Sequence, residues 1–236
     1  MRVRAAHTVR RGLTPEHTKT TDLTEMMMIQ DEKDARKEVK MYSDFKSPYA
    51  YLAFDPAMAL SKRFNVSVRW IPFQLRLKGK GERSVYSEHK IKYSYMDARR
   101  WAKPRGLWIR GPLKIYDTTP AAIGGLFAES HGRFLEYGRE AFRRFFLREF
   151  EADKPDAVAQ LVESLGLSPQ QYLEYFAGEG REAYERCQRE AADDHVFGVP
   201  FFLSEGEPFW GYDRMALLEQ RLTEAGLAID KKASAA

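Results

Sequence analysis

Apolar and polar residues alternate over residues 39–45, and this period of two is typical of a β-strand with one buried face. Ser47 and Pro48 follow, a pair favoured at the N-cap and first position of a helix. The predicted helix contains Pro56, which should kink or restart it because proline cannot donate to the preceding turn. A second strand is predicted over residues 65–73. A strand, a helix and a strand in this order form a βαβ unit with parallel strands and a right-handed crossover.

The middle of the chain, from about residue 75 to 194, has apolar residues at helical spacing. Thr119-Pro120 and Ser168-Pro169 repeat the helix-start pair within it. We interpret the aromatic residues that recur at helical spacing over residues 134–150 as a helical core rather than as a cofactor-binding surface. The pattern therefore predicts a large all-helical insertion after the βαβ unit.

The end of the chain returns to strands. Residues 199–203 and 208–210 have the short apolar pattern of strands, and residues 205–207 between them form a turn. Asp213 is then expected to be the N-cap of a final amphipathic helix. The predicted order is β-α-β, a helical insertion and β-β-α, which makes residues 38–228 one α/β domain.

Both ends of the chain are predicted to be tails. Residues 1–37 are polar and mixed in charge, so we expect a disordered segment. Because several arginines precede the first acidic residue, Glu16, a mitochondrial transit peptide is the alternative. A second alternative is that translation starts at one of the three consecutive methionines from Met26. Residues 229–236 are predicted to be a short C-terminal tail.

Composition narrows the function classes. Hydrophobic residues make up 44% of the 236 residues, enough for a sizeable core. The 38 basic and 34 acidic side chains are interspersed, without the basic stripe of a nucleic-acid-binding surface. No apolar run approaches the ~20 residues of a membrane helix. The single cysteine, Cys187, excludes an internal disulfide, a CxxC pair and a Cys-based zinc site. We therefore expect a cytoplasmic protein without a metal.

Three motifs carry a resemblance to a known family. Residues 43–53, SDFKSPYAYLA, resemble the opening motif of the 2-hydroxychromene-2-carboxylate isomerases, and kappa-class glutathione transferases are similar there. Residues 196–202, VFGVPFF, resemble the family's strand with a cis-proline, and residues 209–214, FWGYDR, resemble its closing segment. A weaker match lies at residues 89–100. The resemblance covers residues 39 to about 226 and implies a DsbA-like thioredoxin fold with a helical insertion.

The chain departs from the family pattern at two positions. His195 stands where a small residue is common, and Tyr212 stands where a short polar residue is common. Both side chains are expected to narrow or remodel the site.

The resemblance implies that Ser47 is the catalytic residue and that glutathione is the cofactor. Ser47 takes the place where oxidoreductases of this fold carry their first cysteine. A hydroxyl at a helix N-terminus favours a bound thiolate through a hydrogen bond and through the helix dipole. The alternative interpretation is that Ser47 is only an N-cap.

Other residues are expected to hold the rest of glutathione. A cis Val199-Pro200 bond would turn the Val199 backbone toward a bound peptide, which it would pair with like a short added strand. The carboxylate of Asp213 suits an α-ammonium group, and Lys90 suits the glycine carboxylate. The expected cofactor-binding set is Val199, Pro200, Tyr212, Asp213 and Lys90.

The function predicted from the resemblance is glutathione-dependent cis–trans isomerisation in aromatic catabolism. Thiolate addition to an unsaturated aromatic keto acid would convert its double bond to a single bond that rotates, and elimination would restore it. The alternatives are a kappa-like transferase, which releases the adduct, and a non-catalytic thioredoxin-fold binding protein. The relatives also imply a homodimer acting on a small molecule.

Overall fold

The computed structural model describes residues 36–75 and 88–229, and the unit that begins at Lys37 is considered by itself. The tail predicted over residues 1–37 lies outside the described residues except for its last two positions. The tail predicted over residues 229–236 lies outside them except for its first position.

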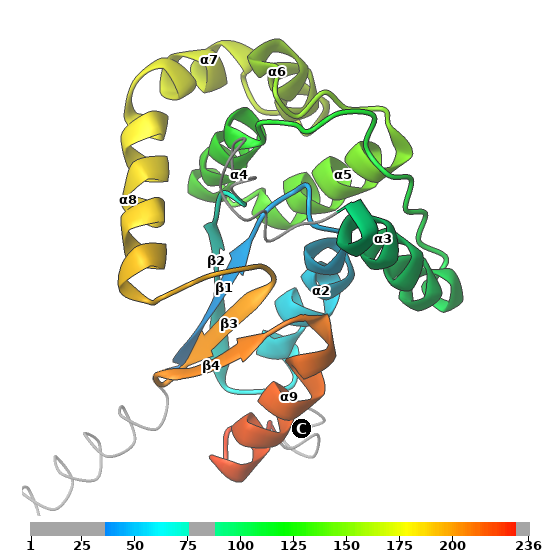
Figure 1. Ribbon diagram of the computed structural model, residues 1–236. Coiled ribbons are helices and arrows are strands. Elements are labelled where there is room, and N and C mark those ends of the chain that lie inside the picture. Colours follow the sequence, from blue (N-terminus) through cyan, green and yellow to red (C-terminus); the bar gives the residue numbers. More distant parts are fainter. Residues whose placement is uncertain (1–35, 76–87, 230–236) are drawn as a thin grey trace, which may run out of the picture. The chain divides into compact units, whose positions relative to one another are not determined.

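Four strands form one mixed sheet in the order β2-β1-β3-β4 (Figure 1). The strands are β1 (Lys37–Ser43), β2 (Val66–Pro72), β3 (Phe201–Ser204) and β4 (Glu207–Trp210). β1 and β2 run parallel, whereas β3 is antiparallel to both β1 and β4. The predicted βαβ unit and closing hairpin are therefore confirmed, although β1 ends before Asp44 and Phe45.

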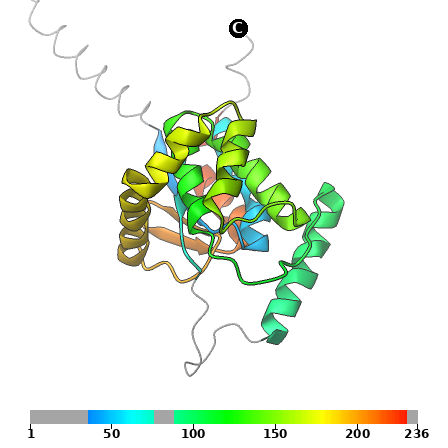
Figure 2. The ribbon, with the colours of Figure 1, turned by 90° about the horizontal axis from the view of Figure 1, so that it is seen from above.

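The helical part agrees with the predicted insertion. The main helices are α2 (Pro48–Met58), α3 (Glu88–Ala102), α4 (Thr119–Ser130), α5 (Phe134–Leu147), α6 (Pro155–Ser164), α7 (Pro169–Ala177), α8 (Glu179–Asp193) and α9 (Met215–Glu224). Short 3₁₀ turns are η1 (Leu60–Lys62), η2 (Lys103–Arg105) and η3 (Tyr212–Arg214). Viewed from above, α3 lies at one side of the helical block, at the right of Figure 2.

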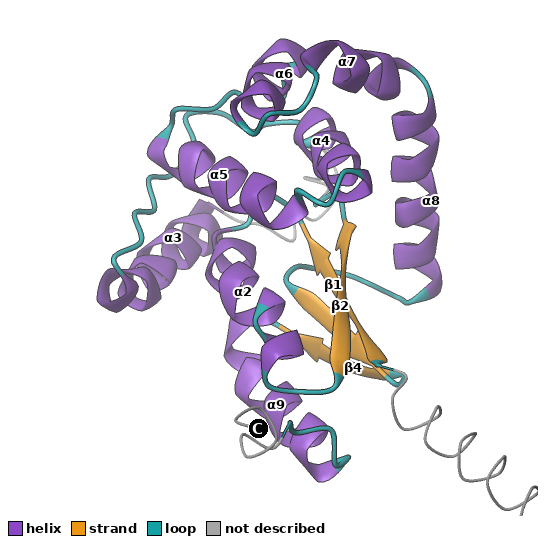
Figure 3. Ribbon diagram, turned by 180° about the vertical axis from the view of Figure 1, so that it is seen from behind, coloured by secondary structure: helices purple, strands orange, loops and turns teal. Residues whose placement is uncertain are grey.

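Successive side chains along a strand point to opposite faces of the sheet, and both faces carry apolar residues. Val39 and Met41 belong to the main core, which includes residues of α2 and α9. Tyr42 and Ile71 point to the other face and pack against Ala191 of α8. Figure 3 shows α2 and α9 on one side of the sheet and α8 on the other. This sandwich fixes the end of β1 and the start of α2, where the site lies.

Pro56 was predicted to kink or restart the helix, and α2 does not restart there. It continues to Met58, with Pro56 inside it. The missing N–H of a helical proline leaves the carbonyl four residues earlier without its usual donor. Here that carbonyl belongs to Leu52, and it accepts a hydrogen bond of 2.6 Å from Nη1 of Arg105. A side chain of η2 thus replaces the lost donor.

Aromatic residues of α5 form core, as interpreted from their spacing: Tyr137, Phe142, Phe145 and Phe146 are buried. Phe142 and Phe146 of α5 are fully buried and stack on Tyr51 of α2, at centroid distances of 5.5 and 5.2 Å. This contact anchors the insertion to the helix that carries Ser47.

Candidate functional site

A cavity of about 540 Å³ opens at the N-terminus of α2. Its walls come from the start of α2, one face of α3, the segment before α4, the loop before β3 and the segment after β4. The structure brings the whole predicted site set together in this cavity, which is lined by Ser47, Lys90, Val199, Pro200, Tyr212 and Asp213. Their roles toward a ligand stay predictions.

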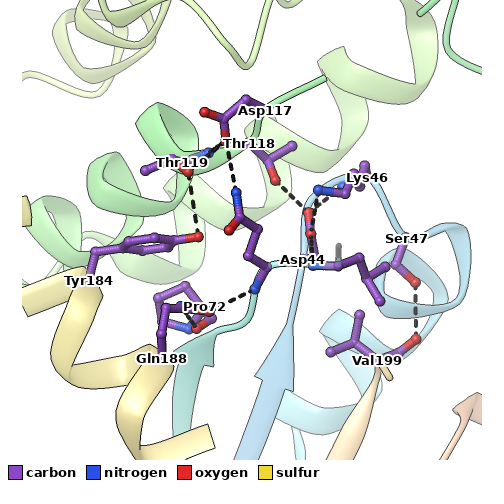
Figure 4. Close-up of polar contacts among 12 residues, drawn as sticks. Asp44, Lys46, Ser47, Pro72, Asp117, Thr118, Thr119, Tyr184, Gln188 and Val199 are labelled. Atoms are coloured by element: carbon purple, nitrogen blue, oxygen red, sulfur yellow. Dashed lines mark hydrogen bonds and ion pairs between the residues drawn. The ribbon is translucent and has the colours of Figure 1, made fainter. Parts of the chain in front are cut away.

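Ser47 is the N-cap of α2, as its sequence predicted. Its backbone is extended, with φ −87° and ψ 117°, and Oγ accepts a hydrogen bond of 3.2 Å from the Ala50 N–H. The hydroxyl donates to the carbonyl oxygen of Val199, also at 3.2 Å (Figure 4). Ser47 is buried, yet it lines the cavity. The hydroxyl therefore stands at the helix end that favours an anion.

The peptide bond between Val199 and Pro200 is cis, which confirms the prediction. The Val199 carbonyl, which we expected to pair with a bound peptide, accepts the Ser47 hydroxyl. The Pro200 carbonyl accepts from the Gly211 N–H at 2.9 Å. This bond ties the loop before β3 to the segment that carries Tyr212 and Asp213.

Asp213 is not the N-cap of the last helix, and that prediction was wrong. The 3₁₀ turn η3 comes first, and α9 begins at Met215 without a side-chain cap. Asp213 lies inside that turn, and its carboxylate pairs with the Arg214 guanidinium at 2.9 Å. A Cβ added at Gly211 would lie 2.5 Å from Oδ1 of Asp213, and Gly211 also has a φ of 111°. Glycine is therefore required for the carboxylate to lie over this backbone.

Tyr212 is held by residues at the end of α3. Its ring meets Trp101 edge-on at a centroid distance of 5.5 Å. The Arg105 guanidinium lies 5.9 Å from the ring centroid. Tyr212 therefore forms a wall of the cavity, and its effect on the site relative to the family pattern stays a prediction.

One stripe of α3 lines the cavity, and most of it was missed in the sequence. Lys90, Ser94, Asp97 and Trp101 lie at spacings of four, three and four residues, which places them on one helix face. This spacing is the sequence signal that could have revealed the α3 face. The hydroxyl of Tyr49, a residue of α2, donates a hydrogen bond of 2.8 Å to the Asp97 carboxylate. Burial together with this bond raises the pKa of Tyr49.

Asp44 is a second feature that the sequence did not reveal. It is buried, and its carboxylate accepts from the Lys46 N–H at 3.0 Å, the Leu75 N–H at 2.9 Å and Thr118 Oγ1 at 2.6 Å. The Lys46 ammonium completes the set at 3.0 Å (Figure 4). Asp44 thereby joins the end of β1 to the segments after β2 and before α4. Lys46 and Leu75 also line the cavity.

His195 does not contribute to the cavity, contrary to the expectation. It is exposed, has a φ of 55°, and is not among the residues that line the cavity. It lies in the turn that follows α8, where its N–H donates to the Ala192 carbonyl at 3.1 Å.

Cys187 is also outside the cavity lining. Burial raises its pKa to about 11, so at neutral pH it is an unreactive thiol.

The part of the chain at residues 36–75 and 88–229 contains no group of three or more His, Cys, Asp or Glu side chains arranged to hold a metal ion. None of its helices has the length and apolar character needed to cross a bilayer.

A family model described as the DSBA-like thioredoxin domain matches residues 38–223. The chain belongs to this family. The DsbA-like chain is 26% identical to the 2-hydroxychromene-2-carboxylate isomerase of Pseudomonas putida over 192 residues, which cover 78% of this chain and 93% of that protein. The isomerase of Sphingobium xenophagum is 24% identical, with 80% and 99% covered. A solved structure of such an isomerase superposes with a TM-score of 0.68 at 25% identity and covers 80% of this chain and 95% of its own. The predicted thioredoxin-like fold and family are thereby confirmed.

Proposed function

We propose that this chain is a glutathione-dependent cis–trans isomerase of the 2-hydroxychromene-2-carboxylate type. The observation that carries the proposal is the Ser47 hydroxyl, which stands at a helix N-terminus and lines a cavity beside a cis-proline. Three similar proteins carry the name of this isomerase. A cavity of about 540 Å³ lies within the ~300–1,000 Å³ range of small-molecule sites.

The residues of the cavity fit the groups of glutathione. Ser47 offers a hydroxyl to a sulfur, and the Asp213 carboxylate suits an α-ammonium group. The Asp213–Arg214 ion pair is more than half exposed, so exchanging it for a ligand costs little. Lys90 lines the cavity from α3 and suits a carboxylate. The chemistry that glutathione supplies is reversible thiolate addition to a conjugated double bond.

The role of Ser47 is to hold the sulfur in its ionised form. The hydroxyl hydrogen that now points to the Val199 carbonyl turns toward the sulfur, while Oγ keeps the bond from the Ala50 N–H. The positive end of the α2 dipole adds to this stabilisation. A serine at this position forms no mixed disulfide, so the thiolate stays available for addition and elimination.

The remaining space is suited to an aromatic substrate. Aromatic side chains line the cavity from four segments: Tyr49, Tyr95, Trp101, Tyr116, Trp210 and Tyr212. Flat rings pack well against such walls. A cytoplasmic location remains a prediction from the composition, and a homodimer remains a prediction from the resemblance.

Incubation of the purified chain with 2-hydroxychromene-2-carboxylate, with and without glutathione, tests the proposal. We expect conversion to the trans open-chain keto acid only with glutathione, which is recovered unchanged. Stoichiometric consumption of glutathione into an adduct would identify a kappa-like transferase instead. Glutathione binding without conversion of either kind would identify a binding protein.

A further inference from the structure

Lys46 gives the cavity a cation that was not among the residues predicted from the sequence. Its side chain is only 12% exposed, lines the cavity and pairs with Asp44 at 3.0 Å. Figure 4 shows the Lys46 ammonium and the Thr118 hydroxyl both directed to Asp44, whereas the Ser47 hydroxyl points to Val199.

The ion pair leaves Lys46 with hydrogen-bonding capacity. Asp44 has three other donors, the Lys46 N–H, the Leu75 N–H and the Thr118 hydroxyl, so its carboxylate is satisfied without the ammonium. An ammonium group carries three N–H donors. Within the described residues, Asp44 is the one partner of this ammonium. Asp44 therefore holds the cation in place without using all of its donors.

Among the residues that the structure describes, the charges that line the cavity are unequal. Four of these residues are cationic, Lys46, Lys90, Lys114 and Arg214, and two are carboxylates, Asp97 and Asp213. Asp97 belongs to α3 and Asp213 to η3, so both carboxylates belong to other walls than Lys46.

The wall next to Lys46 combines positive charge with aromatic surface. Thr118, which touches Asp44, follows Lys114 and Tyr116 on the same segment. The Lys114 ammonium lies 4.8 Å from the Tyr116 ring centroid and pairs with Asp153 at 2.7 Å. Tyr116 and Leu75 line the same cavity. An acid with a flat apolar body fits this wall.

We propose that Lys46 binds the carboxylate of the aromatic keto-acid substrate, an inference that rests on the proposed function. A half-enclosed site strengthens the attraction between the two charges relative to bulk water. The Asp44 contact restricts the lysine side chain before binding, which lowers the entropy lost on binding. Lys46 thereby selects acids over neutral analogues and places the double bond beside the sulfur at Ser47.

Two probes test the inference without requiring turnover: benzylidenepyruvate and its neutral methyl ester. Trp101 and Trp210 line the cavity, so quenching of tryptophan fluorescence reports binding. We expect the parent to bind the acid at least about tenfold more tightly than the ester, and Lys46→Met to remove this preference by weakening only the acid. Lys46→Arg should retain part of the preference.

Two control variants separate the effect of the Lys46 charge from the effects of the surrounding structure. Thr118→Val removes one donor to Asp44 and keeps Lys46, and Lys103→Met removes an exposed lysine that does not line the cavity. Both should keep the acid preference. If Lys46→Met is unstable, the double variant Asp44→Asn, Lys46→Met removes both charges and gives the same readout.

An unchanged acid preference in a folded Lys46→Met variant overturns the inference, whether or not the chain isomerises its substrate. A preference that depends on Lys46, in a chain without glutathione-dependent conversion, supports the acid site and contradicts the proposed function. The two failures are therefore distinguishable.

Discussion

The Ser47 hydroxyl donates to the Val199 carbonyl at 3.2 Å, a contact between residues 152 positions apart in the chain. It joins the first helix of the domain to the loop with the cis-proline. The Ser47 hydroxyl hydrogen that we assign to the glutathione sulfur is thus bonded to the Val199 carbonyl. The sulfur and this carbonyl therefore compete for the same hydrogen. Substitution of Ser47 separates the two roles.

Ser47→Ala removes the N-cap acceptor, and Ser47→Gly retains a tolerable N-cap without a hydroxyl. We expect Ala to lower the free energy of unfolding by ~1 kcal/mol and Gly by less. Both should raise the pKa of the bound glutathione thiol to the same extent, measured by thiolate absorbance near 240 nm, because both lack the donor. An unchanged thiol pKa in a well-folded Gly variant would mean that Ser47 is only an N-cap.

Asp213→Asn tests the carboxylate assigned to the α-ammonium group. Because Asp213 caps no helix and its pair with Arg214 is exposed, we expect the melting temperature to change little. Glutathione affinity, measured by calorimetry, should fall about tenfold, since a neutral amide attracts an ammonium less. Arg214→Gln is the matched control because it breaks the same ion pair while keeping the carboxylate. Equal affinity in the Asn variant and the parent would remove Asp213 from the site.

Arg105→Met leaves the Leu52 carbonyl without its donor inside a helix that contains Pro56. A buried unsatisfied carbonyl costs about 1–3 kcal/mol, which denaturant unfolding should detect. Pro56→Ala restores an N–H for the same carbonyl, so it should stabilise the Arg105→Met background more than the parent. Equal effects of Pro56→Ala in both backgrounds would show that the two residues do not share this acceptor.

Glu190 should make stability depend on pH in the acid range. Its hydrogen bond from Arg69, followed by one from Lys40, lowers its pKa from 4.5 to about 2. The folded state then binds fewer protons than the unfolded state between these values, so unfolding free energy rises with pH across about pH 2 to 4.5. Glu190→Gln should flatten this rise. The loss in unfolding free energy of the variant relative to the parent should be constant above about pH 5.

The control for this measurement is Glu185→Gln. Glu185 is an exposed residue of the same helix without an ion pair among the described residues. It should retain the slope of the parent. A Glu190→Gln variant with the full parental slope would show that other carboxylates account for the acid sensitivity.

The architecture followed from local patterns. Strands were found because a period of two in the apolar residues is typical of extended chain, and α2 was found because Ser47 and Pro48 act on their own helix turn. The last helix was placed correctly, but its cap was not. Asp213 satisfies the preference for an N-cap, yet the 3₁₀ turn η3 makes Arg214, the next residue, the N-cap of α9. Such a turn depends on the Gly211 backbone and on its bond to Pro200.

The sequence by itself determined the order of elements and the position of Ser47 at a helix start, since both depend on neighbours along the chain. It also determined that the chain has a single cysteine. Tertiary structure alone decided the partners: Asp44 with Thr118, Tyr49 with Asp97 and Leu52 with Arg105 lie 74, 48 and 53 residues apart. Packing brings these groups together, and a buried acceptor takes whichever donor packing leaves within reach. That is why the strands and Ser47 were visible in the sequence, whereas the Lys46 wall of the cavity was not.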